Sequence, residues 1–130
     1  MNGYLLDSTV IIDWLRGHPA VTRWLSARAA AGARLVLSPI TVAEVMAGVA
    51  PGLRQRRREE LGAFDFAPLE FEAAALAGET YADLSARGRR LPLPDLLQGA
   101  QARTLGLILA TSNPAHFPDL EVEDPRLQPG

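Results

Sequence analysis

The chain has 130 residues, a formal net charge of −2, 48% hydrophobic residues and 22% charged residues. These values are typical of one globular domain and argue against indiscriminate binding to polyanions. The absence of cysteine excludes disulfides, thiolate zinc sites and cysteine nucleophiles, and it fits a cytoplasmic protein. We expect no signal peptide, because Asp7 and Asp13 interrupt the apolar N-terminal part. We also expect no membrane association, because no stretch reaches the roughly 20 apolar residues of a membrane span.

The N-terminal part of the chain predicts a buried strand that ends at an acid. Tyr4–Leu6 is an apolar run of the kind found inside parallel sheets, and Asp7 follows it directly. Ser8 and Thr9 are suited to cap the next helix, whose apolar residues recur at three- and four-residue steps. Asp7 either shares this cap or stands as a functional carboxylate at the carboxyl edge of a central strand, where open α/β sheets bind ligands.

The middle of the chain predicts helices around two further strands. Pro19 is placed to open a helix, and Arg34–Ser38 reads as a buried strand. Thr41 is suited to cap the following helix, and Glu44 stands three residues later, at the spacing of a capping box. Glu44 is therefore either part of this cap or a second acid beyond a strand end. A charged helix, a short strand and a long alanine-rich helix are expected next, at Leu53–Leu61, Phe64–Phe66 and Leu69–Ala86.

The last third of the chain predicts one more helix and one strongly apolar strand. Two prolines stiffen Leu91–Asp95, and a helix can start at Asp95 or at the proline before it. Leu107–Ala110 is the apolar strand, and polar residues with a turn signal end it. A short edge strand and a loose tail are expected after it, at Leu120–Val122 and Pro125–Gly130.

The order of these elements predicts an α/β fold. Helices on both faces of a mostly parallel sheet of about four or five strands give three layers, α/β/α. We find no internal repeat and no linker, so residues 1–124 are expected to form one domain and residues 125–130 a C-terminal tail.

Three carboxylates and one amide share the same kind of location. Asp7 follows the first strand, Glu44 lies after the second, and Asp95 starts a helix that leads into a later strand. Asn113 comes just after that strand. If the strands are parallel neighbours, these side chains meet in one pocket, where carboxylates raise one another's pKa unless a cation neutralises them. Oxygen ligands without His or Cys select Mg²⁺ or Mn²⁺, which suits phosphoryl transfer. Acids at strand ends are common, so their spacing alone does not define the site.

Four short motifs follow one another within residues 3–123: Leu5–Thr9, Ser38–Gly48, Leu93–Leu97 and Leu109–Asn113. Together they resemble the motif set of PIN-domain ribonucleases. In length and layout the chain is similar to the VapC toxins of bacterial VapBC toxin–antitoxin modules. The resemblance implies a PIN-like three-layer fold and endonucleolytic cleavage of structured RNA of the tRNA or rRNA class.

The resemblance also assigns roles to the site residues. Asp7, Glu44 and Asp95 would hold Mg²⁺ (or Mn²⁺), which activates water for in-line attack on a phosphodiester. Asn113 would be the fourth catalytic position, and Thr9 would support the first acid. Two departures from the family stand out. Asn113 replaces a frequent aspartate and removes one negative charge, and Gln98-Gly99 stands where small or apolar residues are usual.

Partners follow from the same resemblance. Arginines would bind RNA phosphates, and the candidates are Arg87, Arg89 and Arg90. The arginine-rich run at residues 54–58 has two interpretations. The first is a solvated helix face, and the second is another contact with RNA phosphates. A cognate VapB-like antitoxin would lay an amphipathic segment across an apolar groove. The candidate groove residues, for which core packing is the alternative, are Trp14, Leu15, Trp24 and Leu25. The family also implies a homodimer. Separately, we interpret His18 and His116 as surface or turn residues rather than catalysts.

Rival interpretations fit the sequence less well. A haloacid-dehalogenase phosphatase needs Asp-x-Asp at the first strand, whereas Asp7 is followed by Ser8-Thr9. A response-regulator receiver needs a lysine, and the chain has none. The remaining alternative is a catalytically weakened PIN-fold module that binds RNA or protein outside a toxin–antitoxin pair.

Overall fold

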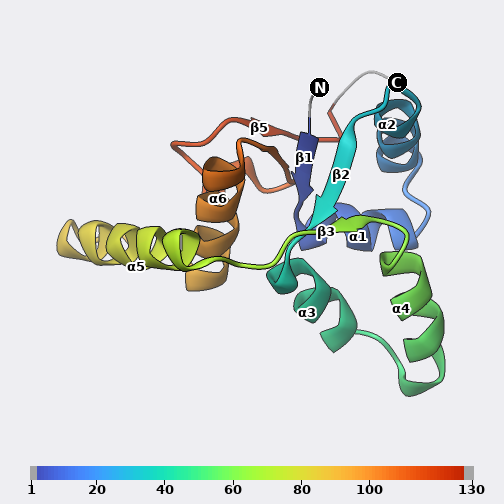
Figure 1. Ribbon diagram of the computed structural model, residues 1–130, viewed down its shortest axis with the longest axis horizontal. Helices are drawn as coiled ribbons and strands as arrows, with labels where there is room; N and C mark the ends of the chain where they lie inside the picture. The colour runs from blue at the N-terminus through green and yellow to red at the C-terminus, as the bar shows by residue number, and fades with distance from the viewer. Residues whose placement is uncertain (1–2, 128–130) are drawn as a thin grey trace.

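A five-stranded parallel sheet organises residues 3–127, the part of the chain that the computed structural model describes (Figure 1). The strand order is β3-β2-β1-β4-β5, so the N-terminal strand is central. The strands are β1 (Gly3–Leu6), β2 (Arg34–Leu37), β3 (Asp65–Phe66), β4 (Ile108–Ala110) and β5 (Val122–Glu123). In register, Leu5 pairs with Val36 on one side and Leu109 on the other. All pairings in this part of the chain are parallel, which confirms the predicted α/β class.

Six α-helices in the described part surround the sheet. They are α1 (Ser8–Leu15), α2 (Pro19–Ala30), α3 (Pro39–Ala47), α4 (Arg54–Leu61), α5 (Phe71–Ala86) and α6 (Leu93–Leu105), with 3₁₀ turns η1 (Pro51–Leu53) and η2 (Pro114–His116). Figure 1 shows α5 and α6 on one side of the sheet and α1 to α4 towards the other. Within residues 3–127, no helix combines the length and the apolar character that crossing a membrane requires.

Alternating side chains of the central strand build two cores. Tyr4 and Leu6 pack with residues of α1, α2, α3 and α4. Leu5 packs into a separate cluster with Leu109 of β4 and Ala102 of α6. This alternation follows from the pleat, which points successive side chains to opposite faces. The helix α5 covers α6 from outside through small alanines that permit close approach. The result is the three-layer α/β/α arrangement that the element order predicts.

The two predicted helix caps are resolved by the structure. Asp7 is the N-cap of α1, as one of the two interpretations of this residue predicts, and its Oδ1 accepts from the Ser8 N–H at 2.9 Å, whereas Ser8 and Thr9 are not the N-cap residue. Ser38, not Thr41, caps α3, and its Oγ accepts from the Thr41 N–H at 3.1 Å. Because α3 begins at Pro39, Thr41 lies inside the helix. Glu44 is therefore not part of a capping box with Thr41.

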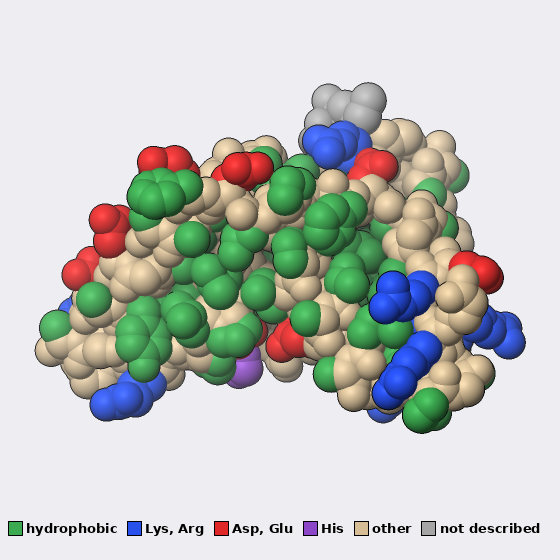
Figure 2. Space-filling view, turned by 60° about the horizontal axis from the view of Figure 1, so that its bottom comes forward, with side chains coloured by type: hydrophobic (Ala, Val, Ile, Leu, Met, Phe, Trp, Pro, Cys, Tyr) green, Lys and Arg blue, Asp and Glu red, His purple; other side chains and the backbone are tan. Residues whose placement is uncertain are grey.

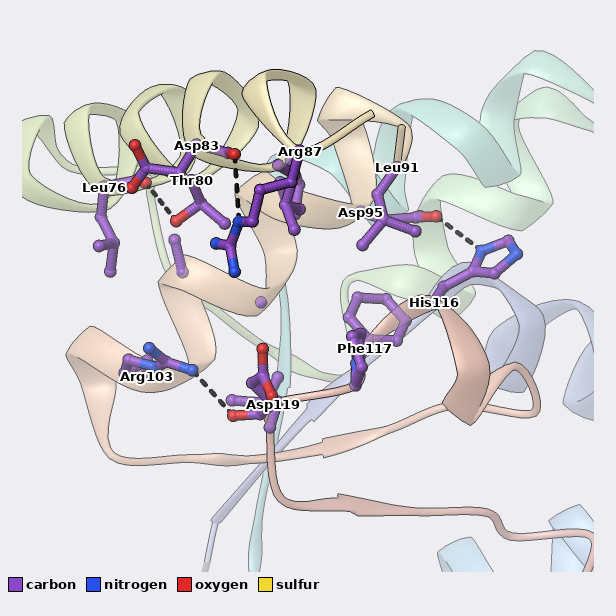
Figure 3. Close-up of a pocket in the computed structure, with 16 residues that line it drawn as sticks. Leu76, Thr80, Asp83, Arg87, Leu91, Asp95, Arg103, His116, Phe117 and Asp119 are labelled. Carbon is purple, nitrogen blue, oxygen red and sulfur yellow. Dashed lines mark hydrogen bonds and ion pairs between the residues drawn. The ribbon is translucent and has the colours of Figure 1, made fainter. Parts of the chain in front are cut away.

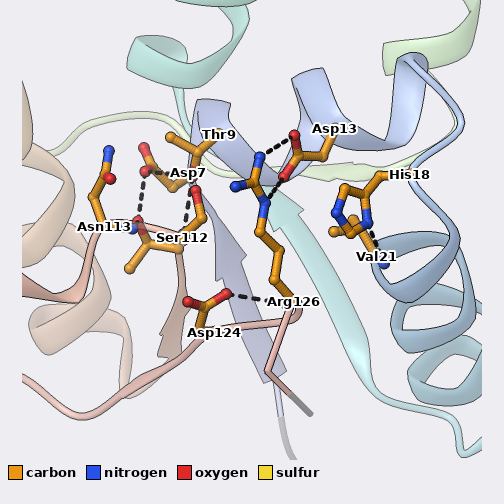
Figure 4. A network of polar contacts seen from close by, with 10 residues as sticks. Asp7, Thr9, Asp13, His18, Val21, Ser112, Asn113, Asp124 and Arg126 are labelled. Atoms are coloured by element: carbon orange, nitrogen blue, oxygen red, sulfur yellow. Dashed lines mark hydrogen bonds and ion pairs between the residues drawn. The ribbon is translucent and has the colours of Figure 1, made fainter. Parts of the chain in front are cut away.

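The C-terminal segment is held more firmly than the predicted loose tail. Pro125 is buried, and the Arg126 guanidinium donates two hydrogen bonds of 2.7 Å to the buried carboxylate of Asp13 in α1 (Figure 4). A bidentate pair of this kind fixes both distance and orientation. Pro125 and Arg126 are thus anchored to the domain, whereas the Leu127 side chain is exposed, and residues 128–130 of the predicted tail lie outside the described part.

Candidate active site

The carboxylate of Asp7 is the centre of a buried hydrogen-bond network at the carboxyl end of β1. Its Oδ1 accepts from Ser8 N–H at 2.9 Å and from Gln98 Nε2 at 3.0 Å. Its Oδ2 accepts from the hydroxyls of Thr9 and Thr111, at 3.0 and 2.8 Å. Asp7 is only 4% exposed, so these donors replace the hydration that burial removes. Asp7 is thus both a helix cap and the centre of a polar site.

The two hydroxyls also fix the loop that follows β4. Thr9 Oγ1 accepts from the Ser112 N–H at 3.1 Å, and Thr111 Oγ1 accepts from the Asn113 N–H at 3.0 Å. Each threonine hydroxyl therefore accepts from a backbone N–H and donates to the Asp7 carboxylate. Figure 4 shows Asp7, Thr9, Ser112 and Asn113 together at this strand end. The structure thus brings the predicted supporting residue Thr9 onto Asp7, and it places Asn113 one hydrogen bond further out.

The other two acids lie in the same electrostatic neighbourhood. Partial burial raises the pKa of Glu44, whose side chain remains in contact with solvent, and the charges of Asp7 and Asp95 raise it further. A hydrogen bond from Ser8 acts in the opposite direction. Burial also raises the pKa of Asp95, and the charge of Asp7 adds to the increase. Repulsion between carboxylates thus adds to the larger effect of burial on both acids.

His116 contacts the third acid, although the sequence indicates only a surface or turn residue. Its Nδ1 lies 2.8 Å from Asp95 Oδ2, and hydrogen bonding with His116 partly counteracts the increase in the pKa of Asp95 (Figure 3). His116 is exposed in the turn η2, as expected, but it also occupies an oxygen of a predicted metal ligand. No pattern in the sequence indicates this contact, because the two residues are 21 positions apart.

The chemistry of these donors fits a hard divalent cation. Three carboxylates and a carboxamide supply oxygen ligands, the set that Mg²⁺ and Mn²⁺ prefer. Burial is the main cause of the raised pKa values of Glu44 and Asp95, and the negative charge of Asp7, which a cation would offset, adds to both. Among residues 3–127, no three His, Cys, Asp or Glu side chains are arranged so that they could hold a metal ion without moving. Oxygens of Asp7 and Asp95 are instead engaged by Gln98 and His116.

A pocket of ≈ 250 Å³ adjoins Asp95 between α5, α6 and the η2 turn (Figure 3). Its walls combine apolar side chains, such as Leu84 and Phe117, with the charged Arg87 and Arg103. Of the three predicted phosphate-binding arginines, Arg87 lines this pocket. The other two, Arg89 and Arg90, are exposed in the segment between α5 and α6.

A second hollow, of ≈ 320 Å³, lies between α1, α3 and the η1–α4 segment. Of the four predicted groove residues, only Leu15 lines it. Trp24 and Leu25 are 2% and 5% exposed and belong to the core, so the groove prediction is wrong for them and core packing is right. The Trp24 ring packs edge-on against Tyr4, with centroids 4.9 Å apart, and Trp14 packs likewise on Phe64 at 5.2 Å.

The fold and the site together define a PIN domain. Asp7 follows β1, Glu44 lies in α3 after β2, and Asp95 lies in the first turn of α6, and each of the last two feels the charge of Asp7. The PIN domain family model matches residues 4–122, and the chain belongs to this family.

Individual relatives narrow the comparison. Ribonuclease VapC10 from Mycobacterium tuberculosis is 33% identical over 127 residues, which cover 97% of this chain and 95% of the relative. The structure of VapBC-1 from nontypeable Haemophilus influenzae has a TM-score of 0.80 at 25% identity and covers 95% of this chain and 98% of that one. A toxin–antitoxin complex from Klebsiella pneumoniae has a TM-score of 0.77 at 26% identity, with coverages of 94% and 97%. The chain is thus a homologue of the VapC ribonuclease toxins, as the resemblance of its motifs predicts.

Gln98 is the site residue that sequence reasoning missed. The sequence marks it only as a departure from the usual small or apolar residue, with no role attached. In the structure it is fully buried and reaches Asp7 across 91 positions of sequence. The available signal was a pair of glutamines, Gln98 and Gln101, three residues apart on a helix face that is otherwise built from small apolar residues.

Proposed function

We propose that this chain is an endoribonuclease toxin that uses Mg²⁺ or Mn²⁺, and that a VapB-like antitoxin neutralises it. The observation that supports the proposal best is the shared electrostatic neighbourhood of Asp7, Glu44 and Asp95, delivered from three elements. Nearly full-length similarity to a ribonuclease of the same family supports the reaction type.

Each residue has a role in this proposal. Asp7, Glu44 and Asp95 would hold the cation, and Asn113 would orient a ligand or water beside them. A bound divalent cation would neutralise charge on the phosphate and lower the pKa of a water molecule. Thr9 and Thr111 fix the direction of the Asp7 carboxylate through their 3.0 and 2.8 Å hydrogen bonds. This positioning matters because small displacements of reacting groups cost large factors in rate.

The surroundings of Asp95 support RNA as the substrate. The pocket beside it offers apolar walls on which a base can lie and Arg87 for a phosphate. The exposed Arg89 and Arg90 extend the positive charge along the same segment. Unpaired loops of structured RNA, such as those of tRNA or rRNA, are the substrates that fit, because their bases can leave the stack and enter a pocket.

The groove between α1, α3 and η1–α4 supports an antitoxin as the partner. Its apolar lining is provided by Ile12, Leu15, Val45, Val49 and Leu53. Glu44 lies in the same groove, and Arg16 and Arg57 line it too. Figure 2 shows apolar side chains spread over one face of the molecule, with basic side chains of α4 at its right. A segment with apolar side chains and one basic residue would fill the groove and pair with Glu44.

A homodimer is part of the same proposal. Phe71 and Tyr81 on α5 are 82% and 36% exposed, which leaves large apolar side chains on the outer layer. A second copy that packed on this layer would bury them. Light scattering of the purified protein measures the mass directly, and a monomer at all concentrations would contradict this part.

The test of the function is cleavage of a structured RNA by the purified protein. We expect cleavage with Mg²⁺ or Mn²⁺, none with excess EDTA, and none by Asp95→Asn. A cognate VapB-like antitoxin, when co-expressed, should co-purify with the chain and stop cleavage. RNA binding without cleavage under all metal conditions would instead favour the alternative, a weakened PIN-fold binding module.

A further inference from the structure

Gln98 links the elements that carry the three acids. It lies in α6, three residues after Asp95, and its side chain is fully buried. Its Nε2 donates to Asp7 Oδ1 at 3.0 Å, beyond the end of β1. Its Oε1 lies 3.1 Å from the hydroxyl of Thr41 in α3, the helix that also carries Glu44. One amide therefore joins α6, the end of β1 and α3, the three elements that position the acids.

The hydrogen bonds of Asp7 leave no lone pair of its carboxylate without a donor. A carboxylate offers about four lone-pair sites, two on each oxygen. Asp7 accepts four hydrogen bonds, two on Oδ1 and two on Oδ2. A cation that binds Asp7 must therefore take the place of one of these donors.

The four donors differ in how easily they can leave. The Ser8 N–H belongs to the first turn of α1 and is fixed by the backbone. The hydroxyls of Thr9 and Thr111 are held because each also accepts a backbone N–H of the loop after β4. Gln98 is the one side-chain donor whose group accepts no backbone N–H; its amide is otherwise held only by the Thr41 hydroxyl, 3.1 Å from its Oε1.

We propose that Gln98 is a positioning residue that occupies Asp7 Oδ1 and competes with the divalent cation for it. This inference rests on the proposed function, in which Asp7 is a metal ligand. The Gln98 amide compensates part of the Asp7 charge, and it withdraws when the cation binds. The chain thereby exchanges a hydrogen bond for a metal contact, and its affinity for the cation is lower than that of a site with an apolar residue at this position.

The experiment compares two buried glutamines of one helix. Gln98→Leu removes the donor to Asp7, while Thr41 keeps the Leu6 carbonyl oxygen 2.8 Å from its hydroxyl. Gln101→Leu is the matched control, because Gln101 is also buried but donates to the backbone carbonyls of Ala67 and Pro68, at 2.9 and 3.2 Å. Both proteins are stripped with EDTA and titrated with Mn²⁺ by calorimetry, and their melting is followed with and without Mn²⁺.

Gln98→Leu should bind Mn²⁺ on the order of tenfold more tightly than the unmodified chain, because one charge-assisted hydrogen bond no longer competes. By linkage, saturating Mn²⁺ should raise its melting temperature more than that of the unmodified chain. Gln101→Leu should lose stability equally with and without Mn²⁺. Equal or weaker Mn²⁺ binding by Gln98→Leu would overturn the inference, whereas absence of Mn²⁺ binding by the unmodified chain would overturn the proposed metal site itself.

A second measurement uses the unmodified chain and does not depend on how a variant folds. The side-chain amide protons of Gln98 and Gln101 are followed by NMR as Mg²⁺ is added. The Gln98 proton that is bonded to the carboxylate should move upfield as that bond is lost, and the Gln101 signals should stay in place. A Gln98 signal that keeps its position at saturating Mg²⁺ would mean that the amide remains on Asp7, and the inference would fail.

Discussion

Replacing Asp7 by asparagine should weaken the fold as well as the chemistry. Asparagine keeps one acceptor oxygen, so two of the four hydrogen bonds to position 7 lose their acceptor. Hydrogen bonds to a charged group contribute about 1.5–3 kcal/mol each, and the hydroxyls of Thr9 and Thr111 recover part of this by accepting from the new amide. A net loss of about 2–4 kcal/mol corresponds to a fall in melting temperature of roughly 10 °C for a chain of this size.

The matched variant is Asp95→Asn. In the unmodified chain, the Asp95 carboxylate contacts His116 on a side that is open to solvent, and the charge of Asp7 repels it. The amide removes this repulsion, so melting should change by no more than about 3 °C. Thermal unfolding of both variants in EDTA, followed by circular dichroism, tests this difference. If Asp7→Asn melts within about 2 °C of the unmodified chain, the four hydrogen bonds do not stabilise the site as we argue.

Three further outcomes are expected. Burial raises the pKa of Glu44 and Asp95 above the ordinary 4.5 and 3.8. The folded chain therefore binds protons at these acids more tightly than the unfolded chain does. Ionising the acids then lowers the free energy of unfolding as the pH rises through the raised pKa values. Mn²⁺ should therefore raise the melting temperature more at neutral pH than at about pH 5, and an equal rise at both would contradict this. Neutralising Arg89 and Arg90 together should reduce the salt dependence of RNA binding by up to about 1.4 in log–log slope; an unchanged slope would place the phosphate contacts elsewhere. Leu53→Asp, at a groove residue that is 42% exposed, should weaken the antitoxin complex at least about tenfold without unfolding the chain, and an unchanged affinity in a binding assay would move the interface away from this groove.

The sheet and the location of the acids were predictable because both depend on local signals. Apolar runs such as Tyr4–Leu6 and Leu107–Ala110 are too short for helices and end at polar residues, which marks strands and their carboxyl ends. Parallel order then places the residues after those strands at one edge. Asp7, at the end of β1, and Thr111, at the end of β4, meet there for this reason.

The caps and the surfaces were harder to predict for physical reasons. Asp7, Ser8 and Thr9 can all cap a helix, and only the backbone direction at the strand end decides which of them does. Trp24 shows a different limit. A buried core and an apolar groove require the same residue types, so the pattern cannot separate them, and in the structure the ring packs on Tyr4 beneath Arg28.

The role of Gln98 depends on how α6 is rotated against the sheet. A polar residue on a buried helix face signals that it has a partner, but not which one. Only the three-dimensional arrangement shows that Gln98 faces Asp7 whereas Gln101, almost one turn later, faces the backbone at Ala67.

The central claim is that acids from three elements work together on one phosphodiester. Asp95→Asn tests it most directly, because this change removes one carboxylate and should leave the fold in place. We expect the purified variant to melt like the unmodified chain and to bind RNA, yet to leave that RNA uncut in Mn²⁺ while the unmodified chain cleaves it. Cleavage by the folded variant at the unmodified rate would show that Asp95 takes no part in the reaction and would contradict the account.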